Sequence, residues 1–292
     1  MSFQDQLEQF KQTDFYKKTD FIKDFDSKAE NLDDWLSLAQ RWANYQSEKS
    51  ELSTHIPKTI HQVWVGSPLP DKYKNWTESW KRNGWEYNLW TEEKLLPIFT
   101  EEEKEWYFST PNPGPRSDLA RYKLLALYGG IYCDTDFECL KDFSPVTDTT
   151  TLFAGVIFDT KPEIAGGIVG AVPSHPLILE TLKKLLECKK LNLEYNNILD
   201  KTGPAFFTRI IQENKELLKP TDVFFPTHYL YPLPNYEAVN SISPKKLKHK
   251  FIKPESIAIH YWEVSWTPDS NWLIRCIKTI IKKVIFYEYW KK

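Results

Sequence analysis

Two aspartates stand one residue apart in the segment LYGGIYCDTDFECL, residues 127–140. Asp134 and Asp136 come directly after a short apolar run that has the character of a buried strand. Side chains two positions apart on a strand share a face, with Cα atoms roughly 6.5 Å apart, so the two carboxylates would repel each other. Carboxylate oxygens suit Mg²⁺ or Mn²⁺, and these ions commonly bridge to substrate phosphates. The pattern favours a metal–diphosphate site, and the alternative is a solvated turn with two acids.

A second charged pair lies shortly before these aspartates. Asp118 and Arg121 are three positions apart in the helix-prone segment DLARYKLLALY, so they would share a helix face. An arginine presents a planar fork suited to phosphate, and a carboxylate accepts hydrogen bonds from sugar hydroxyls. The alternative is a surface ion pair worth about 0–1 kcal/mol. The neighbouring aspartates favour the functional interpretation.

The surrounding sequence alternates β-prone and helix-prone segments, which predicts an α/β fold with a parallel or mixed sheet. The predicted strands are residues 60–65, 86–90, 131–133, 151–158 and 166–172. Three helices are predicted. The first follows the capping residue Thr91, and the second begins at the capping residue Ser117 and ends at Gly129 and Gly130. The third spans residues 175–190.

The two ends of the chain differ from this middle part. Residues 1–50 are polar and helix-prone, and we expect a helical N-terminal extension that packs on the catalytic domain, residues 51–270; the alternative is a partner-binding arm. Residues 271–292 have the pattern of a basic amphipathic helix. Such a helix either lies in an anionic membrane interface or packs on the catalytic domain.

Composition excludes several classes of protein. The 292 residues have a formal charge of −2, which argues against nucleic-acid binding. The four cysteines lack CxxC spacing, so neither a zinc site nor a disulfide framework is expected. The first residues carry charges without an apolar core, and no run is long enough to span a membrane. We therefore expect a cytoplasmic protein. If residues 271–292 lie in a membrane interface, the protein would be peripheral on the inner face of the plasma membrane.

The segment SDLARYKLLALYGGIYCDTDFE, residues 117–138, resembles the signature of DXD-type glycosyltransferases. The most similar family is the sugar-transferase family of capsular polysaccharide transferases, yeast-type outer-chain mannosyltransferases and α-1,4-N-acetylglucosaminyltransferases, with a looser likeness to large glucosylating toxins. Further blocks fall in the family's order, namely IPKTIHQVWVGSPLP (56–70), TGPAFFT (202–208) and AIHYWEVSW (258–266).

The resemblance implies a GT-A (Rossmann-like) nucleotide-sugar transferase fold with a mixed central sheet flanked by helices. It also implies a metal-dependent, retaining hexosyltransferase that uses Mn²⁺ or Mg²⁺ and a nucleotide-sugar donor, UDP-linked rather than GDP-linked. The acceptor would be a glycan or a lipid-linked saccharide. The enzyme would act in the biosynthesis of polysaccharides, including capsular polysaccharide.

The resemblance also assigns roles to individual residues. Asp118, Arg121 and Asp136 are the expected catalytic residues, and Asp118 and Arg121 would hold the donor sugar and the diphosphate. Asp134 would reach the ribose and, through water, the metal, which Asp136 would bind directly. Trp64 would stack on the donor base, and His260 would be a third metal ligand. Ser265 and Trp266 would contact the diphosphate.

A purely structural role is the alternative for several of these residues. Trp64 could equally be a tryptophan of the hydrophobic core, and His260 could be a histidine at a strand end with only a structural hydrogen bond. His61 is expected to be structural. Where the family often has a sugar-contacting Asn, residues 163–176 have none, and Gly166 and Gly167 would instead allow close backbone approach.

Two other functions compete with glycosyl transfer. The segment IYCDTDFEC also resembles the DxDx(T/V) motif of haloacid-dehalogenase-like phosphohydrolases, in which Asp134 would be the nucleophile. That motif expects Thr or Val at the position of Glu138 and normally lies on the first strand. A non-catalytic carbohydrate-binding protein rich in aromatic residues would need neither the two aspartates nor the Asp118–Arg121 pair.

Overall fold

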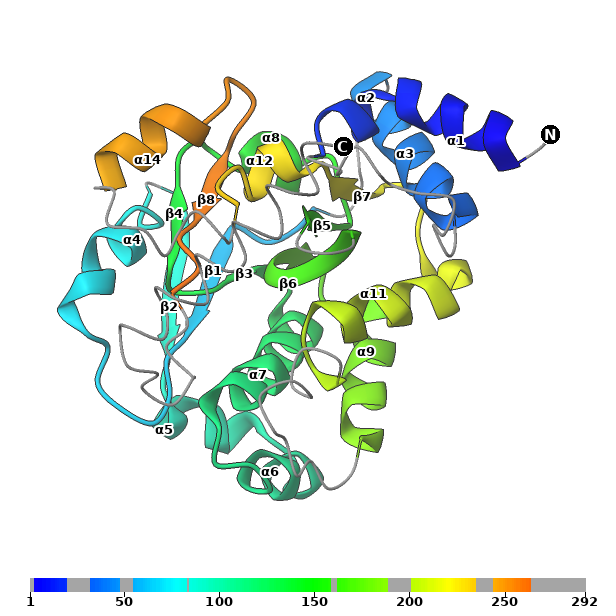
Figure 1. Ribbon diagram of the computed structural model, residues 1–292. Helices are drawn as coiled ribbons and strands as arrows, with labels where there is room; N and C mark the ends of the chain where they lie inside the picture. The colour runs from blue at the N-terminus through cyan, green and yellow to red at the C-terminus, as the bar shows by residue number, and fades with distance from the viewer. Residues whose placement is uncertain are drawn as a thin grey trace, which may run out of the picture.

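The computed structural model describes residues 3–19, 32–47, 55–82, 84–158, 162–188, 201–234 and 244–263. A six-stranded sheet with helices on both faces forms its centre (Figure 1). The strands of this sheet are β1 (Thr59–Val63), β2 (Glu86–Trp90), β3 (Gly130–Cys133), β5 (Leu152–Phe158), β6 (Pro162–Ala171) and β7 (Asp222–Phe225).

The strand order is β2-β1-β3-β6-β5-β7. β1 pairs in parallel with β2 and β3, β6 runs antiparallel to β3 and β5, and β7 is parallel to β5. The mixed α/β sheet expected from the sequence is therefore confirmed. Because β1, β2 and β3 are parallel, their carboxyl ends meet at one edge, where ligands bind in open α/β sheets.

A separate two-stranded sheet stands beside this edge. β4 (Phe137–Cys139) pairs antiparallel with β8 (Ala258–His260), and Phe137 is the register partner of His260. Only the residues from Asp134 to Asp136 separate β3 from β4. The chain thus leaves the large sheet and enters the small one within the motif that carries the two aspartates.

Helices cover both faces of the large sheet (Figure 1). α7 packs on β1, β3 and β6, α11 packs on β6, and α9 lies beside both helices; on the other face α3 packs on β7 and α12 on β5. The longer helices are α3 (Leu32–Ser47), α6 (Glu101–Phe108), α7 (Pro113–Tyr128), α9 (Pro176–Glu187), α11 (Pro204–Glu213) and α14 (Pro244–Phe251). The short helices are α4 (Lys74–Glu78), α5 (Glu92–Leu95), α8 (Ser144–Thr147) and α12 (Thr227–Leu230), with 3₁₀ turns at η1 (Asp71–Tyr73), η2 (Leu96–Ile98) and η3 (Lys215–Leu217).

The N-terminal helices α1 (Phe3–Gln12), α2 (Asp14–Lys17) and α3 share the main hydrophobic core. Trp42 of α3 packs edge-on against Phe225 of β7 and Tyr229 of α12. The backbone N–H of His228 donates to the carbonyl of Lys18. These contacts show that α3 packs on the edge strand β7, with α1 and α2 packed on α3, and that the end of α2 reaches α12.

The start of α7 differs from the expectation. Ser117 was the predicted cap, but the helix begins at Pro113, and Asn112 caps it by accepting a hydrogen bond from the N–H of Gly114 at 2.9 Å. A proline at the first helical position needs no hydrogen-bond acceptor, so the helix starts one turn earlier. Gly129, with φ +63°, ends the helix as predicted, because a Cβ there would collide with Pro173 and Ala171.

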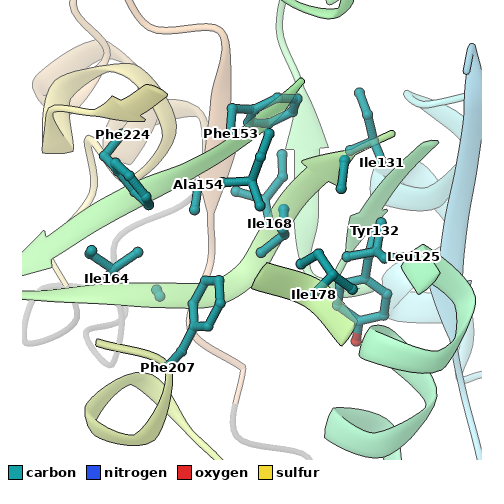
Figure 2. Close-up of a cluster of buried hydrophobic side chains, with 14 of the residues drawn as sticks. Leu125, Ile131, Tyr132, Phe153, Ala154, Ile164, Ile168, Ile178, Phe207 and Phe224 are labelled. Atoms are coloured by element: carbon teal, nitrogen blue, oxygen red, sulfur yellow. The ribbon is translucent and has the colours of Figure 1, made fainter. Parts of the chain in front are cut away.

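The core lies between the central strands and the helices below them in Figure 2. Leu125 of α7 and Ile178 lie on one side of the sheet, near Tyr132, and Phe153 lies on the other side, where it packs on Phe225 of β7 (Figure 2). Phe207 of α11 covers β6 near Ile164. α7, which carries Asp118 and Arg121, is thus packed against β6 and against β3, the strand that Asp134 follows.

Part of the predicted architecture lies outside the described residues. This applies to the predicted helix at 271–292 and to Ser265 and Trp266. In the part of the chain that the structure describes, no helix combines the length and apolarity that crossing a membrane requires.

Candidate active site

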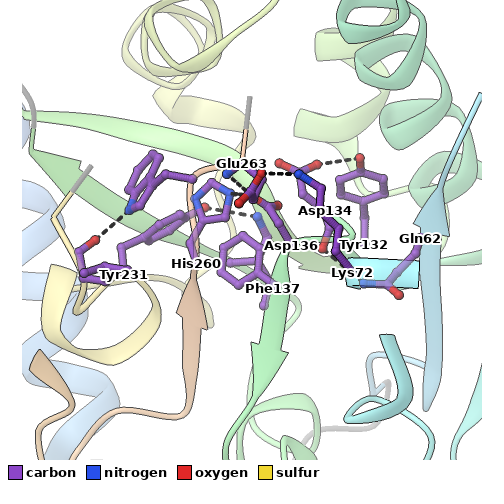
Figure 3. Close-up of polar contacts among 12 residues, drawn as sticks. Gln62, Lys72, Tyr132, Asp134, Asp136, Phe137, Tyr231, His260 and Glu263 are labelled. Carbon is purple, nitrogen blue, oxygen red and sulfur yellow. Dashed lines mark hydrogen bonds and ion pairs between the residues drawn. The ribbon is translucent and has the colours of Figure 1, made fainter. Parts of the chain in front are cut away.

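The two aspartates lie in a tight turn between β3 and β4. The N–H of Phe137 donates to the carbonyl of Asp134 at 3.1 Å, which closes the turn. The expectation that both acids share the face of one strand is therefore wrong. The backbone reverses between them because the chain passes from the large sheet to the small one, and the turn still directs both carboxylates to one place (Figure 3).

Asp134 is anchored by four hydrogen bonds, three to residues of the large sheet and one to Arg121 of α7. Its N–H donates to the carbonyl of Gly167 on β6 at 2.8 Å, and its carbonyl accepts from Nε2 of Gln62 at 3.1 Å. Its Oδ1 accepts from the hydroxyl of Tyr132 at 2.7 Å and from Nη2 of Arg121 at 3.2 Å. The side chain remains 31% exposed, so Oδ2 stays available to a ligand.

Asp118 and Arg121 form a buried ion pair behind Asp134. Nη1 of Arg121 lies 2.8 Å from Oδ1 of Asp118, and the two side chains are only 6% and 10% exposed. Burial raises the pKa of Asp118 to about 6, against the opposing charge of Arg121. A solvated surface pair is therefore excluded. A single guanidinium holds two carboxylates, one from α7 and one from the turn.

Asp136 and His260 meet across the small sheet. Nε2 of His260 lies 3.1 Å from both carboxylate oxygens of Asp136. The N–H of Glu263 donates to Oδ2 of Asp136 at 2.7 Å, and the His260 ring stacks on Phe137 at 4.4 Å between ring centroids. The side chains of Asp136 and His260 are 7% and 11% exposed. Both side chains are thus fixed by packing before any ligand arrives.

Asp134, Asp136 and His260 converge as a possible metal site. One ligand atom from each residue lies within 4.8 Å of the other two. Two carboxylates and an imidazole suit Mg²⁺ or Mn²⁺, ions that keep further positions for water and phosphate. Nδ1 of His260 is buried and has no hydrogen-bond partner among the described residues. The donor set therefore fits the divalent cation that the sequence predicts.

The electrostatics of Asp134 support the same conclusion. Burial raises its pKa, the positive charge of Arg121 lowers it, and the neighbouring charge of Asp136 raises it again. Two acids this close resist simultaneous ionisation, and a bound cation would relieve their repulsion.

Gly166 and Gly167 on β6 make room for the charged groups. A Cβ atom at Gly166 would collide with Nη1 of Arg121. At Gly167 it would lie 3.1 Å from Oδ2 of Asp134 and from the hydroxyl of Tyr231. In the region where the family often has an Asn, these two glycines leave room beside β6, and Arg121 fills part of it.

Trp64 and His61 of the first block have different surroundings. Trp64 is half-buried, its Nε1 donates to Ser67 at 3.2 Å, and its ring tilts against Tyr73 at 4.8 Å between centroids. His61 is buried, with Nε2 bonded to the carbonyl of Gly129 at 3.0 Å and Nδ1 accepting from Trp90 at 3.0 Å. His61 is structural, as expected, while base stacking on Trp64 remains a prediction.

An ion pair connects the turn η1 with the segment that follows β8, close to the aspartates. Nζ of Lys72 in η1 lies 2.5 Å from Oε2 of Glu263, which follows β8 (Figure 3). Between β8 and Glu263, Trp262 has a φ of +56° and tilts against His260 at 4.2 Å between ring centroids. The backbone is therefore held in an unusual conformation beside His260, just before the predicted diphosphate contacts Ser265 and Trp266, which lie outside the described residues.

Sequence reasoning missed Tyr132, Gln62, Lys72 and Glu263. Tyr132 was detectable, because it lies on β3 two residues before Asp134, and side chains at that spacing near a strand end point to the same side. The role of Gln62 depends on the pairing of β1 with β3, and the Lys72–Glu263 pair joins segments far apart in sequence. No local pattern indicates these long-range contacts.

Most of the site lies within a segment that matches a family model. Residues 70–153 match the model of the glycosyltransferase sugar-binding region containing the DXD motif, in agreement with the family that the sequence resembles. This region includes Asp118, Arg121, Asp134 and Asp136.

Curated relatives match over about 60% of the chain. It is 31% identical over 176 residues to inositol phosphoceramide mannosyltransferase 1 of Schizosaccharomyces pombe, covering 56% of this chain and 53% of that protein. It is 30% identical over 186 residues to mannosyl phosphorylinositol ceramide synthase SUR1 of Saccharomyces cerevisiae, covering 60% and 47%. The chain thus spans about half the length of these relatives.

Two of the solved structures that the chain resembles are a toxin domain and a glycosyltransferase. The catalytic domain of alpha-toxin from Clostridium novyi has a TM-score of 0.48 and 11% identity, over 86% of this chain and 87% of that one. The PaToxG glycosyltransferase has a TM-score of 0.46 and 16% identity, over 64% and 83%.

Proposed function

We propose that this protein is a metal-dependent glycosyltransferase that moves a hexose from a nucleotide-sugar donor to an acceptor hydroxyl, with retention of anomeric configuration. The observation that carries the proposal is the convergence of Asp134, Asp136 and His260 on one point, with the Asp118–Arg121 pair directly behind it. The match of the surrounding region to DXD sugar-binding regions supports it.

Each residue of the cluster has a proposed role. Asp136 and His260 would hold a divalent cation directly, and Asp134 would reach it through water with its free Oδ2. When bound, such a cation supplies positive charge that offsets the charge developing on the departing diphosphate. Arg121 keeps Asp118 and Asp134 in place and adds a fixed positive charge close to the leaving group. Asp118 accepts hydrogen bonds from the donor sugar.

The acceptor hydroxyl enters on the face from which the diphosphate leaves. The leaving phosphate takes the acceptor proton in this scheme, so no protein nucleophile is required.

The relatives suggest the sugar and the acceptor. Their names describe mannosyl transfer to inositol phosphoceramide. We therefore favour mannose as the sugar and a phosphorylated inositol lipid as the acceptor, ahead of a capsular polysaccharide. The expectation of a UDP-linked rather than a GDP-linked donor stays a prediction.

A donor screen tests the proposal. Purified protein with Mn²⁺ is given a panel of UDP- and GDP-linked sugars, and released nucleotide is measured with and without inositol phosphoceramide. NMR of the product's anomeric carbon tests retention. Asp136→Ala should abolish nucleotide release, while Asp142→Ala, an exposed acid beyond β4, should leave it unchanged.

Other outcomes identify the competing functions. Release of phosphate from a phosphomonoester, without nucleotide release from any sugar donor, would indicate a phosphohydrolase. Saccharide binding that survives Asp136→Ala, without turnover in either protein, would indicate a carbohydrate-binding module.

A further inference from the structure

Helix α14 and the two residues after it form a strongly basic segment. The sequence from 244 to 253, PKKLKHKFIK, has five lysines and no acidic residue, whereas the whole chain has a formal charge of −2. His249, Lys250 and Lys253 are exposed to solvent. We call residues 244–253 the basic helix segment.

The basic helix segment is fixed to the small sheet that carries the metal-site residues. Phe251 and Ile252 pack on the hydrophobic cluster formed by Leu233, Ile259 and Tyr261. The segment is therefore attached to the small sheet through apolar contacts.

A polar link reaches from the same segment to the active-site strands. Nζ of Lys248 lies 2.5 Å from Oε1 of Glu138, and the hydroxyl of Tyr261 donates to Oε2 of Glu138 at 2.7 Å. Glu138 is two residues after Asp136 on β4, and Tyr261 follows His260. Figure 1 shows α14 beside α4, above β4 and β8. The segment and the candidate metal site thus belong to one packed unit.

We propose that the basic helix segment docks the catalytic centre on an anionic lipid surface. This inference depends on the proposed function, in which the acceptor is a phosphorylated lipid that resides in a membrane. Lysines near an anionic bilayer are attracted by its negative surface potential, and the attraction extends over about one Debye length. Because the segment is attached to β4 and β8, docking there would set the small sheet next to the lipid headgroups.

Vesicle binding of the full chain tests the proposal. Wild-type protein should co-sediment with vesicles of phosphatidylcholine and phosphatidylserine at low salt, should dissociate as salt is raised, and should not bind phosphatidylcholine alone. The double variant Lys250→Gln, Lys253→Gln should bind the anionic vesicles about 30-fold more weakly, given the usual contribution of each lysine near such a surface.

A matched control separates a local effect from net charge. Lys183→Gln, Lys184→Gln on α9 changes the charge by the same amount, and α9 packs on α7 and α11 instead of the small sheet. This control should bind the vesicles as wild type does. Equal loss in both double variants would overturn the proposal, because the effect would then follow overall charge.

Three further outcomes would also overturn it. The first is an absence of binding to anionic vesicles at low salt. The second is unchanged binding by the Lys250, Lys253 variant, which would place lipid contact elsewhere in the chain. The third is binding to a soluble polyanion such as heparin but not to vesicles, which would indicate a different partner.

Failure of this inference is distinguishable from failure of the proposed function. Nucleotide release from the donor in the absence of lipid reports the catalytic site alone, and it should be the same in wild type and both double variants. Loss of vesicle binding with unchanged nucleotide release supports docking by the segment. Absence of nucleotide release in wild type contradicts the proposed function without depending on lipid.

Discussion

The guanidinium group of Arg121 occupies the space that a side chain at Gly166 would need. Arg121 comes from α7 and Gly166 from β6, and their close approach lets the guanidinium bridge Asp118 and Asp134. The effects of substitutions at Gly166 and Arg121 should therefore depend on each other.

Gly166→Ala should displace Arg121 and lower kcat/KM for nucleotide release by about 100-fold, because small misplacements of catalytic groups have effects of this size. In an Arg121→Ala background the same substitution should have almost no further effect, since the colliding group is gone. Gly170→Ala, on the same strand, meets the Phe153 ring instead and should lower stability while leaving kcat/KM intact. Additive effects of Gly166→Ala and Arg121→Ala would contradict the coupling.

Asp136→Asn should remove divalent cation binding, because it removes a charge while it keeps the shape of the side chain. In wild type, Mn²⁺ should raise the thermal unfolding temperature, since a ligand that binds only the folded state stabilises it. The variant should show no such rise, and EDTA should abolish turnover in wild type. An equal Mn²⁺ effect in both proteins, or full turnover in EDTA, would exclude this metal site.

Arg121→Lys keeps the positive charge but cannot hold two carboxylates with a planar fork. We expect a loss of about 1–3 kcal/mol in transition-state stabilisation, measured as kcat/KM. Wild-type kinetics in this variant would show that the charge alone suffices, and that the bridge between Asp118 and Asp134 has no role in catalysis.

Tyr132→Phe removes the hydroxyl that donates to Oδ1 of Asp134. A hydrogen bond to a charged group contributes about 1.5–3 kcal/mol, so divalent cation affinity, measured by titration, should fall about tenfold or more. Tyr107→Phe is the matched control, because it removes a hydroxyl that donates to a carboxylate of Glu92 at 3.0 Å, away from the site. Equal cation affinity in wild type and Tyr132→Phe would show that Arg121 positions Asp134 alone.

His61 should make the protein less stable in mild acid. Burial lowers the pKa of His61 to about 4, and its Nδ1 already accepts a hydrogen bond from Trp90. Between about pH 6.5 and pH 4 the unfolded chain binds a proton at His61 that the folded protein does not. The free energy of unfolding should therefore fall as pH falls through this window, by on the order of 3 kcal/mol in total.

The variant His61→Phe should lose this part of the pH dependence while lowering stability at all pH values. Chemical denaturation at several pH values measures both effects. A slope in His61→Phe equal to that of wild type would assign the pH dependence to other groups.

Local patterns predicted most of the elements around the site. The strand at Glu86–Trp90, the helix at Pro176–Glu187 and the glycine that ends α7 follow from alternation, periodicity and backbone freedom. The i, i+3 relation placed Asp118 and Arg121 together because it is a property of any helix. These predictions needed no information about tertiary structure.

The remaining features depend on contacts between distant segments. The turn at Asp134–Asp136 reverses only because β4 finds β8 as a partner, and nothing near the motif specifies that partner. The start of α7 was misplaced because Ser117 and Asn112 are both good caps, and Pro113 decides between them. The space beside Gly166 has meaning only when α7 lies against β6.

The passage of the chain from the large sheet to the small one, within the Asp134–Asp136 turn, has a mechanical consequence. Asp134 is tied to β6 of the large sheet, whereas Asp136 and His260 belong to β4 and β8. An ion that binds Asp136 and His260 directly, and Asp134 through water, would cross-link the end of the large sheet to the small sheet and resist relative motion of the two. Binding and release of the ion would then change how rigidly the two sheets are held together.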